Sequence, residues 1–279
     1  MSTRSKTMMR VGVVQMNSQD DVAANLERAV HWIGDAARAG AELVALPENF
    51  SFMGEEAQKR EIAESLDGAL PGPILGALIA TAKEHGVWIV GGGMPEASKD
   101  ASRPYNTSVL VAPSGEIVAT YRKVHLFDVS LADGTSLRES AATMAGSDPV
   151  SARVGPTTLG MTICYDVRFP ELFRRLVDQG ARVVTVPSAF TLTTGKDHWH
   201  VLLRARAIEN QVFVLAPAQH GKHPKGRQTY GKSLICDPWG DVLAQCAEGE
   251  GTCVASLDFE HQDRVRASLP SLLHRKWPA

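Results

Sequence analysis

Three reactive side chains follow apolar, strand-like runs in the sequence. Each is the last residue of its run: Glu48, Lys123 and Cys164. A strand that ends at a reactive residue presents that side chain at the edge of a sheet, where several strand ends can meet. A thiol, a carboxylate and an ammonium together supply a nucleophile, a base and an electrostatic stabiliser. The sequence therefore favours catalysis with a cysteine nucleophile.

The sequence around Cys164 indicates a sharp turn at the nucleophile. The run 158–164 favours β-structure, and a helical pattern that begins with Pro170 follows within a few residues. Such a turn would bring the sulfur close to backbone N–H groups that can hold an oxyanion. The N–H of Tyr165 is the candidate donor.

Each of the three residues also has a simpler interpretation when it is taken alone. A single cysteine at a strand end is usually a small hydrophobic residue of the core. Glu48 suits the first turn of a helix, where a carboxylate is favoured. Lys123 suits a solvated hairpin end. The catalytic interpretation therefore depends on the sequence around all three.

That surrounding sequence resembles the three motifs of the nitrilase, or carbon–nitrogen hydrolase, superfamily. The motifs lie at 46–49, 121–128 and 163–171. One motif alone would be a weak signal, whereas three in the family's order are specific. The resemblance extends over nearly the whole chain. It implies a Glu–Lys–Cys triad on an α/β fold, a four-layer α-β-β-α sandwich.

The resemblance also implies a reaction sequence. Glu48 takes the proton of Cys164, and the thiolate attacks an amide carbonyl. Lys123 stabilises the oxyanion, and one such donor typically contributes about 3–4 kcal/mol. Glu48 then protonates the departing amine and activates the water that hydrolyses the thioester. No cofactor and no metal enter this scheme.

A fourth residue, Glu139, lies in the stretch 134–140, which matches the family segment that brings a second glutamate to the site. Its implied role is to position Lys123 and the amide nitrogen. The alternative is an ordinary surface ion pair with the neighbouring Arg138.

Two further pairs of stretches narrow the implied substrate. The residues at 187–195 and 198–210 resemble the Nit amidase branch of the family. The residues at 218–223 and 230–233 are more similar to the Nit members that act on deaminated glutathione than to the omega-amidases. The implied reaction is a metabolite-repair step that yields 2-oxoglutarate and cysteinylglycine. The alternatives are an omega-amidase acting on 2-oxoglutaramate, a nitrilase, and an N-carbamoyl amine hydrolase.

Basic residues are the candidates for binding the carboxylates of such a polyanionic substrate. The loop 222–232 contains Lys222, Lys225, Arg227 and Lys232, but a basic loop can also be merely solvated. The candidate substrate-binding residues, including two weaker ones, are Tyr165, Arg168, Thr191, Lys222 and Arg227.

Arg168 has an alternative interpretation of its own. It stands four residues after Cys164, and it could instead form a helix-flanking salt bridge with Asp166 or Glu171.

Composition limits the other classes of function. The 279 residues are 44% hydrophobic and 22% charged with a net charge of −2, which is ordinary for a globular enzyme and gives no footprint for nucleic acid. No run approaches the roughly 20 apolar residues of a membrane span. We expect a single domain of residues 1–279, with 1–9 as a flexible N-terminus. Family members commonly form dimers or larger assemblies, which implies a homo-oligomer.

The cysteines and the N-terminus predict a cytoplasmic protein. Residues 1–10 are polar and basic and lack the apolar stretch of a secretory signal. The four cysteines include no CxxC pair and no disulfide-framework spacing, which is typical of a reducing compartment.

Strand-like runs alternate with helical patterns along the chain, which predicts helices covering a mixed sheet. The helices are expected from Asp21 to Gly40, from Pro71 to His85, from Pro170 to Gln179 and from His198 to Glu209. Two hairpins are expected, at 109–119 and at 233–244. The two-sheet layering itself is implied by the family and not by periodicity.

Two other patterns point to functions that we do not favour. Residues 226–233 match the P-loop pattern GxxxxGK[ST], but Pro238 and Gly240 leave no room for the helix that must follow such a loop. His198 and His200 are two residues apart on an expected helix and so face different directions, which argues against a zinc site. His220 and His223 are interpreted as solvated or hydrogen-bonded side chains.

Overall fold

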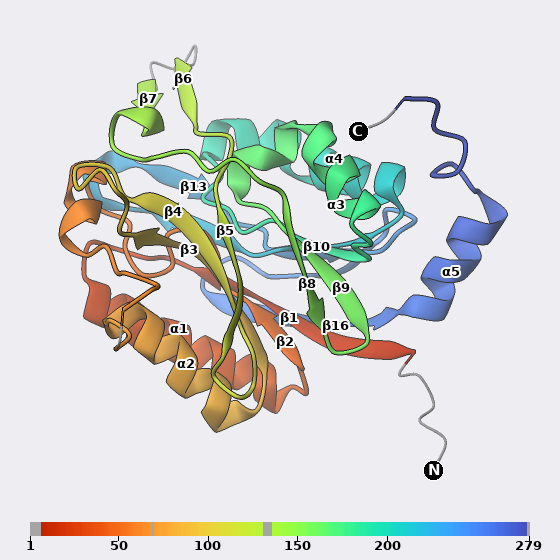
Figure 1. The fold of residues 1–279 in the computed structure, drawn as a ribbon, viewed down its shortest axis with the longest axis horizontal. Coiled ribbons are helices and arrows are strands. Elements are labelled where there is room, and N and C mark those ends of the chain that lie inside the picture. The colour runs from red at the N-terminus through yellow and green to blue at the C-terminus, as the bar shows by residue number, and fades with distance from the viewer. Residues whose placement is uncertain (1–6, 69, 131–135, 278–279) are drawn as a thin grey trace.

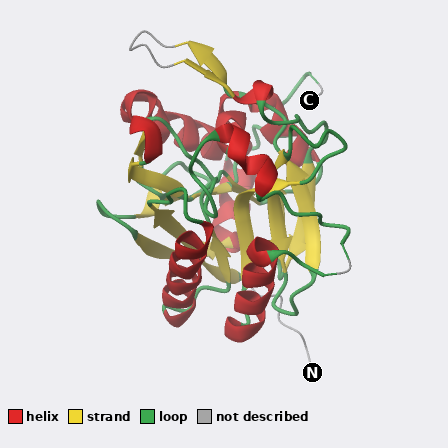
Figure 2. Ribbon diagram, turned by 90° about the vertical axis from the view of Figure 1, so that its left-hand side faces the viewer, coloured by secondary structure: helices red, strands yellow, loops and turns green. Residues whose placement is uncertain are grey.

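Two facing β-sheets form the middle of the molecule, and helices cover their outer faces. The computed structural model describes residues 7–68, 70–130 and 136–277. Figure 2 shows one pair of helices on each side of the strands, and Figure 1 identifies the pairs as α1 with α2 and α3 with α4. This is the expected four-layer α-β-β-α arrangement.

The first sheet combines strands from the beginning of the described chain with strands from its last third. Its strands, in spatial order, are β13 (Gln228–Tyr230), β12 (Ala218–Lys222), β1 (Met8–Met16), β2 (Leu43–Ala45), β3 (Trp88–Glu96), β4 (Tyr105–Val111) and β5 (Ile117–Arg122). The strand β16 (Gly251–Asp258) also pairs with β1, in antiparallel register. The central strands β1, β2 and β3 are parallel to one another, so their carboxyl ends lie at one edge.

The second sheet runs in the order β15 (Val242–Gln245), β14 (Leu234–Cys236), β11 (Phe213–Ala216), β10 (Val183–Thr185), β9 (Thr157–Met161) and β8 (Val150–Val154). The strands β9, β10 and β11 are parallel. A separate two-stranded ribbon is formed by β6 (Asp128–Ser130) and β7 (Ser136–Arg138).

The helices that cover the sheets begin and end at recognisable signals. They are α1 (Val22–Arg38), α2 (Pro73–His85), α3 (Pro170–Asp178), α4 (Leu192–Asn210) and α5 (Phe259–Ser268). The Asp21 side chain caps α1 by accepting a hydrogen bond from the N–H of Ala24 at 3.0 Å. At the end of α2, Gly86 adopts φ = 65°, a left-handed conformation that glycine adopts without strain.

Short 3₁₀-helices connect several elements near the carboxyl ends of the strands. They are η1 (Glu56–Glu61), η2 (Glu139–Ala141), η3 (Cys164–Arg168) and η4 (Pro224–Gly226).

Two hydrophobic cores join the layers. Val14, Ile33 and Leu78 belong to the core between the first sheet and its helices, and all three are essentially inaccessible to solvent. Tyr121 and Trp199 belong to the larger core, which joins the two sheets and packs α3 and α4. Because apolar burial is the main favourable contribution to folding, these cores fix the strand ends in place.

Most of the expected elements are confirmed, with three differences. The helix expected from His198 begins six residues earlier, at Leu192, so that His198 lies in its second turn. The expected flexible N-terminus extends too far, because β1 already begins at Met8, while residues 1–6 lie outside the described residues. The strand β16 and the helix α5 were not anticipated. No helix in the described part of the chain is long and apolar enough to cross a membrane.

Candidate active site

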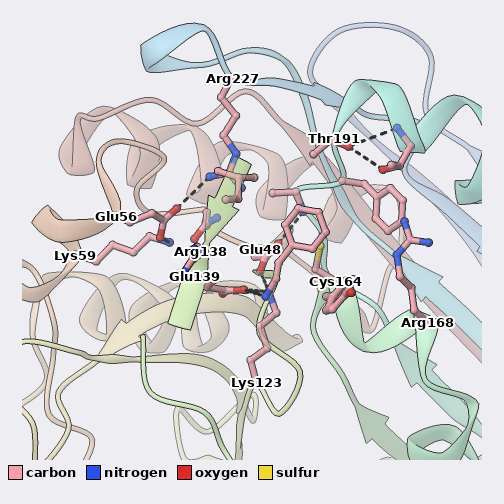
Figure 3. Close-up of a pocket in the computed structure, with 17 residues that line it drawn as sticks. Glu48, Glu56, Lys59, Lys123, Arg138, Glu139, Cys164, Arg168, Thr191 and Arg227 are labelled. Atoms are coloured by element: carbon pink, nitrogen blue, oxygen red, sulfur yellow. Dashed lines mark hydrogen bonds and ion pairs between the residues drawn. The ribbon is translucent and has the colours of Figure 1, made fainter. Parts of the chain in front are cut away.

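Glu48, Lys123 and Cys164 converge at one end of the two sheets. Glu48 follows β2, Lys123 directly follows β5, and Cys164 follows β9 at the start of η3. All three side chains line one pocket, which Figure 3 shows from close by. The convergence expected from the three strand ends is therefore present in the structure.

Cys164 occupies a sharp turn, as the sequence indicated. Its φ is 48°, which places a non-glycine residue in the left-handed region at a cost of roughly 1–2 kcal/mol. Two hydrogen bonds hold the turn: the Cys164 N–H donates to the carbonyl of Pro187 at 2.8 Å, and the Ile163 N–H donates to Asp166 Oδ2 at 2.8 Å. Cys164 is 8% exposed, and its thiol interacts electrostatically with the Glu48 side chain.

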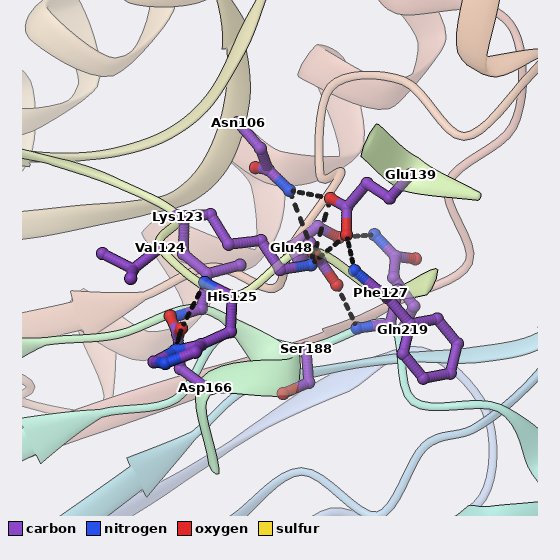
Figure 4. A network of polar contacts seen from close by, with 12 residues as sticks. Glu48, Asn106, Lys123, Val124, His125, Phe127, Glu139, Asp166, Ser188 and Gln219 are labelled. Carbon is purple, nitrogen blue, oxygen red and sulfur yellow. Dashed lines mark hydrogen bonds and ion pairs between the residues drawn. The ribbon is translucent and has the colours of Figure 1, made fainter. Parts of the chain in front are cut away.

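Lys123 lies between two carboxylates. Its Nζ is 2.9 Å from Glu48 Oε1 and 2.8 Å from Glu139 Oε2. The Asn106 amide donates to both, at 3.0 Å to Glu48 Oε1 and at 3.3 Å to Glu139 Oε1. Figure 4 shows this network. The alternative pairing of Glu139 with Arg138 is not formed among the described residues, and Glu139 instead belongs to the cluster.

A backbone donor also holds each carboxylate. The Ala189 N–H donates to Glu48 Oε2 at 2.9 Å, and the Phe127 N–H donates to Glu139 Oε2 at 2.7 Å. The carboxylates therefore have little freedom to rotate away from the ammonium.

Burial and charge together set the protonation states of the triad. Burial alone would raise the pKa of Glu48, but the charge and hydrogen bond of Lys123 bring the pKa below its ordinary value. Burial would lower the pKa of Lys123, yet Glu139 and Glu48 raise it well above its ordinary value. Burial and the Glu48 charge raise the pKa of the Cys164 thiol far above its ordinary value, although Lys123 opposes this. The resting site thus contains a thiol, a carboxylate and an ammonium.

Asp166 connects the Cys164 turn to the loop that carries Lys123. It is fully buried and accepts hydrogen bonds from the Tyr121 hydroxyl at 2.7 Å and from the His125 N–H at 3.1 Å, besides that from Ile163. The His125 ring nitrogen Nδ1 also lies 2.7 Å from Asp166 Oδ1. Because both segments are tied to one carboxylate, the sulfur and the ammonium keep their relative positions.

Four of the five substrate-binding candidates line the pocket: Tyr165, Arg168, Thr191 and Arg227. The pocket volume, including its open mouth, is about 590 Å³, within the usual range for small-molecule sites. The structure does not bring Lys222 there. Its side chain is exposed at the end of β12, because the strand pairing of β12 with β13 turns it to solvent.

Arg168 does not form the salt bridge that was its alternative interpretation. Its guanidinium lies 5.1 Å from the Phe190 ring and 5.9 Å from the Tyr165 ring, measured to the ring centroids. Its Nη1 is 3.3 Å from Nδ1 of His198. Within the described residues Arg168 has no carboxylate partner, so its charge is available at the pocket.

Sequence reasoning missed several lining residues. Glu56, Lys59 and Arg138 face the pocket, and Asn106 bridges the two carboxylates beneath it. Lys59 stands in a run of mixed charges at 55–61 that resembles a solvated helix face, so the sequence carried no signal for its burial.

The two disfavoured patterns are placed as follows. The P-loop-like stretch 226–233 runs through β13 towards β14, and no helix follows it. His223 is buried between the Ser18 carbonyl, 2.8 Å from Nδ1, and the Thr229 hydroxyl, 2.7 Å from Nε2. Over the residues that the structure describes, no group of three or more His, Cys, Asp or Glu side chains is placed to hold a metal ion.

Two helix-covered sheets with a thiol, a carboxylate and an ammonium at the strand ends are the arrangement expected of a hydrolase with a cysteine nucleophile. The chain belongs to the carbon-nitrogen hydrolase family, whose model matches residues 10–267. The resemblance seen in the sequence motifs is thereby confirmed.

The chain is similar to proteins with named activities. A Synechocystis sp. protein named deaminated glutathione amidase is 47% identical over 265 residues, covering 94% of this chain and 96% of that protein. The Homo sapiens protein of the same name is 41% identical over 282 residues, covering 99% of this chain and 84% of that protein. The crystal structure of Saccharomyces cerevisiae Nit3, a member of branch 10 of the nitrilase superfamily, is similar with a TM-score of 0.88 at 32% identity, covering 99% of this chain and 98% of that one.

Proposed function

We propose that this protein is an amidase that hydrolyses deaminated glutathione to 2-oxoglutarate and cysteinylglycine. One observation supports the reaction class above all others: the Cys164 thiol shares one pocket with a Glu48 carboxylate that is itself held by a buried ammonium. The names of the relatives at 41% and 47% identity support the choice of substrate.

In the first half-reaction we assign Cys164 as the nucleophile and Glu48 as the base. The thiol is protonated at rest, so its proton passes to Glu48 as the sulfur attacks the amide carbon. The carbonyl oxygen gains negative charge, which Lys123 and the Tyr165 N–H stabilise. Glu48 then gives the proton to the amide nitrogen, the carbon–nitrogen bond breaks, and cysteinylglycine leaves as the amine. The acyl group remains on sulfur as a thioester.

In the second half-reaction a water molecule replaces the departed amine. Glu48 takes one of its protons, and the oxygen attacks the thioester carbon. The carbon–sulfur bond breaks, the proton returns to the sulfur of Cys164, and 2-oxoglutarate leaves. We assign Glu139 the role of holding Lys123 in its charged form and in position throughout.

The charge of the pocket supports a dianionic substrate. Its lining residues include five cationic and three anionic side chains, so with the thiol neutral the pocket has an excess of two positive charges. Deaminated glutathione carries two carboxylates, one at each end. Arg168 and Arg227 are our candidates for receiving them, and Tyr165 and Thr191 complete the walls.

Substrate competition tests this function. Specificity constants would be measured for deaminated glutathione, 2-oxoglutaramate, an aliphatic nitrile and an N-carbamoyl amino acid, with Cys164→Ala as the blank. We expect the first substrate to have the highest kcat/KM and the variant to be inactive. A higher kcat/KM for any of the others would reject the assigned substrate, and full activity in the variant would reject the mechanism.

We also propose that the protein forms a homodimer in the cytoplasm. The helix α4, the turn after β14 and the strand β15 expose apolar side chains: Val201, Ile208, Trp239, Val242 and Leu243. A patch of this kind on an enzyme commonly marks an interface. Val201→Glu should give monomers in light scattering if the patch joins two copies. The four free cysteines support a reducing compartment.

A further inference from the structure

Lys59 is a second buried ammonium in the active-site pocket. Its residue exposure is 6%, and its Nζ lies 2.7 Å from Glu56 Oε2. Its charge also contributes to the lowered pKa of Glu48, which places it within electrostatic reach of the catalytic base. An ammonium has three donors, and Glu56 is the one ion-pair partner of Lys59 within the described residues.

Arg227 shares the same carboxylate. Its Nη1 lies 3.1 Å from Glu56 Oε1, so each oxygen of Glu56 faces one cation. These two charges lower the pKa of Glu56 to about 2 against the opposing effect of burial, so the carboxylate is ionised. One negative charge cannot balance two positive ones. The cluster of Glu56, Lys59 and Arg227 therefore carries a net positive charge into the pocket.

One hydrogen-bond donor of this cluster has no partner among the described residues. The Arg227 Nε is buried and has no hydrogen-bond partner among the described residues. A buried donor without a partner is costly unless a ligand or water satisfies it. Positive charge and an unpaired donor together suit a carboxylate.

Two positions in the pocket can thus receive a carboxylate, and they lie on opposite sides of Cys164. Figure 3 shows Lys59 and Glu56 on one side and Arg168 on the other, with the thiol between them. The side of the cluster is the more enclosed at Lys59, which is buried, whereas Arg168, like Glu56 and Arg227, is half-buried.

The order of the chemical steps decides which end of the substrate each side receives. The dipeptide must leave after the first half-reaction and water must enter, while the acyl group stays bound to sulfur. The leaving group therefore belongs on the open side and the acyl group on the enclosed side. We propose that Lys59 and Arg227 bind the carboxylate of the 2-oxo acid, the acyl part of the substrate, while the dipeptide carboxylate lies towards Arg168. This assignment rests on the proposed function.

Three amides separate the two ends of the substrate. Deaminated glutathione has both carboxylates, and 2-oxoglutaramate keeps the acyl part but loses the dipeptide. N-(4-oxopentanoyl)-cysteinylglycine keeps the dipeptide and replaces the acyl carboxylate with a methyl group. Lys59→Met should lower kcat/KM by about 10- to 100-fold on the first two, and by the same factor, because a charge-assisted hydrogen bond is lost. On the third it should change kcat/KM by less than about twofold, because no carboxylate is present to lose its partner.

Two further variants serve as controls. Lys222→Met removes a lysine that does not line the pocket and should leave all three specificity constants unchanged. Lys59→Arg keeps the charge and should recover most of the activity on the first two amides. An equal loss on all three amides would mean that Lys59 acts through Glu48 or the fold, and no loss on any would mean that it does not bind substrate. Either result overturns the proposal.

A binding measurement keeps this test separate from that of the substrate. Calorimetric titration of 2-oxoglutarate requires no turnover, and Lys59→Met should weaken its binding by about 10-fold or more while leaving cysteinylglycine binding unchanged. If the wild-type enzyme does not cleave deaminated glutathione, the proposed substrate fails, yet this titration still decides the acyl-carboxylate subsite. Equal 2-oxoglutarate affinity in the wild type and the variant would reject the subsite.

Discussion

Replacing Glu139 with glutamine should slow the reaction and change its pH dependence. Glu139 accepts from Lys123 at 2.8 and 3.1 Å, so it supplies the larger share of the contacts that hold the ammonium. A hydrogen bond to a charged group contributes about 1.5–3 kcal/mol. The glutamine keeps one acceptor oxygen and loses the charge, so we expect a loss of about 2 kcal/mol of transition-state stabilisation, or about 30-fold in kcat.

The pH profile distinguishes the loss of the Glu139 charge from a mere loss of rigidity around Lys123. Glu139 and Glu48 raise the pKa of Lys123 above its ordinary value, against burial, which favours the neutral amine. Without the Glu139 charge the Lys123 pKa falls, so the ammonium is lost at lower pH. The alkaline limb of the kcat profile should therefore move to lower pH in Glu139→Gln.

The assay is steady-state turnover across a pH series, with melting temperatures to verify folding. Glu171→Gln removes an exposed carboxylate on α3 that does not line the pocket and should match the wild type. A Glu139→Gln enzyme with an unaltered kcat, or with a lower kcat and an unmoved alkaline limb, would refute the assigned role of Glu139.

Three other changes have defined outcomes. Asp166→Asn turns one acceptor into a donor that faces the Tyr121 hydroxyl or the His125 N–H. The change should lower the free energy of unfolding by about 3 kcal/mol in a urea titration, and it should lower kcat more than it raises KM. Unaltered stability would show that Asp166 does not connect the Cys164 turn to the Lys123 loop. Arg168→Met should lower kcat/KM for deaminated glutathione more than for 2-oxoglutaramate, and an equal loss would move the dipeptide elsewhere. Burial, aided by the charges of Arg227 and His220, lowers the pKa of His223 to about 4 from its ordinary value of 6.5. As the pH falls, His223 therefore takes up a proton in the unfolded chain before it does so in the folded chain. The free energy of unfolding should therefore fall by up to about 3 kcal/mol between about pH 6.5 and about pH 4, and His223→Gln should reduce that fall; an unreduced fall would assign the acid sensitivity to other groups.

The sequence could indicate that these three reactive side chains lie together because each has a local signal. Glu48, Lys123 and Cys164 each end an apolar run, and each stands in a motif of its own. The positions of strand ends follow from hydrophobic periodicity, which is encoded within a few residues. Convergence then follows from strand direction: β2 and β9 lie in parallel pairings, and β5 runs in the same direction as β3 because two antiparallel pairings separate them.

The start of α4 could not be predicted in the same way. Its first turn contains Thr193, Thr194 and Gly195, which are weak helix formers, so the pattern indicated a helix only from His198. The structure explains the glycine: a Cβ at Gly195 would lie 2.3 Å from the Cβ of Tyr230. Close packing against β13, a tertiary contact, thus determines that residue. The Thr191 side chain caps the helix by accepting from the N–H of Thr194.

Lys59 shows the same limit at the site itself. Most of the other residues at 55–61 are charged, which locally predicts solvent exposure. Its burial depends instead on the contact between η1 and the loop that carries Arg227, and these lie far apart in the chain. Charge clusters assembled from distant segments leave no periodic trace in a sequence.

In the proposed mechanism, the resting charges of Glu48, Lys123 and Cys164 explain why proton transfer accompanies attack on the substrate. A free thiolate beside the Glu48 carboxylate would place like charges together in a buried site, which is why the Cys164 pKa is raised. Lys123 is shared with Glu139 and cannot stabilise both anions fully. When the proton moves to Glu48 as the carbon–sulfur bond forms, the negative charge passes from the carboxylate to the carbonyl oxygen. The net charge of the buried site then stays constant, and the ammonium interacts with an anion at every step.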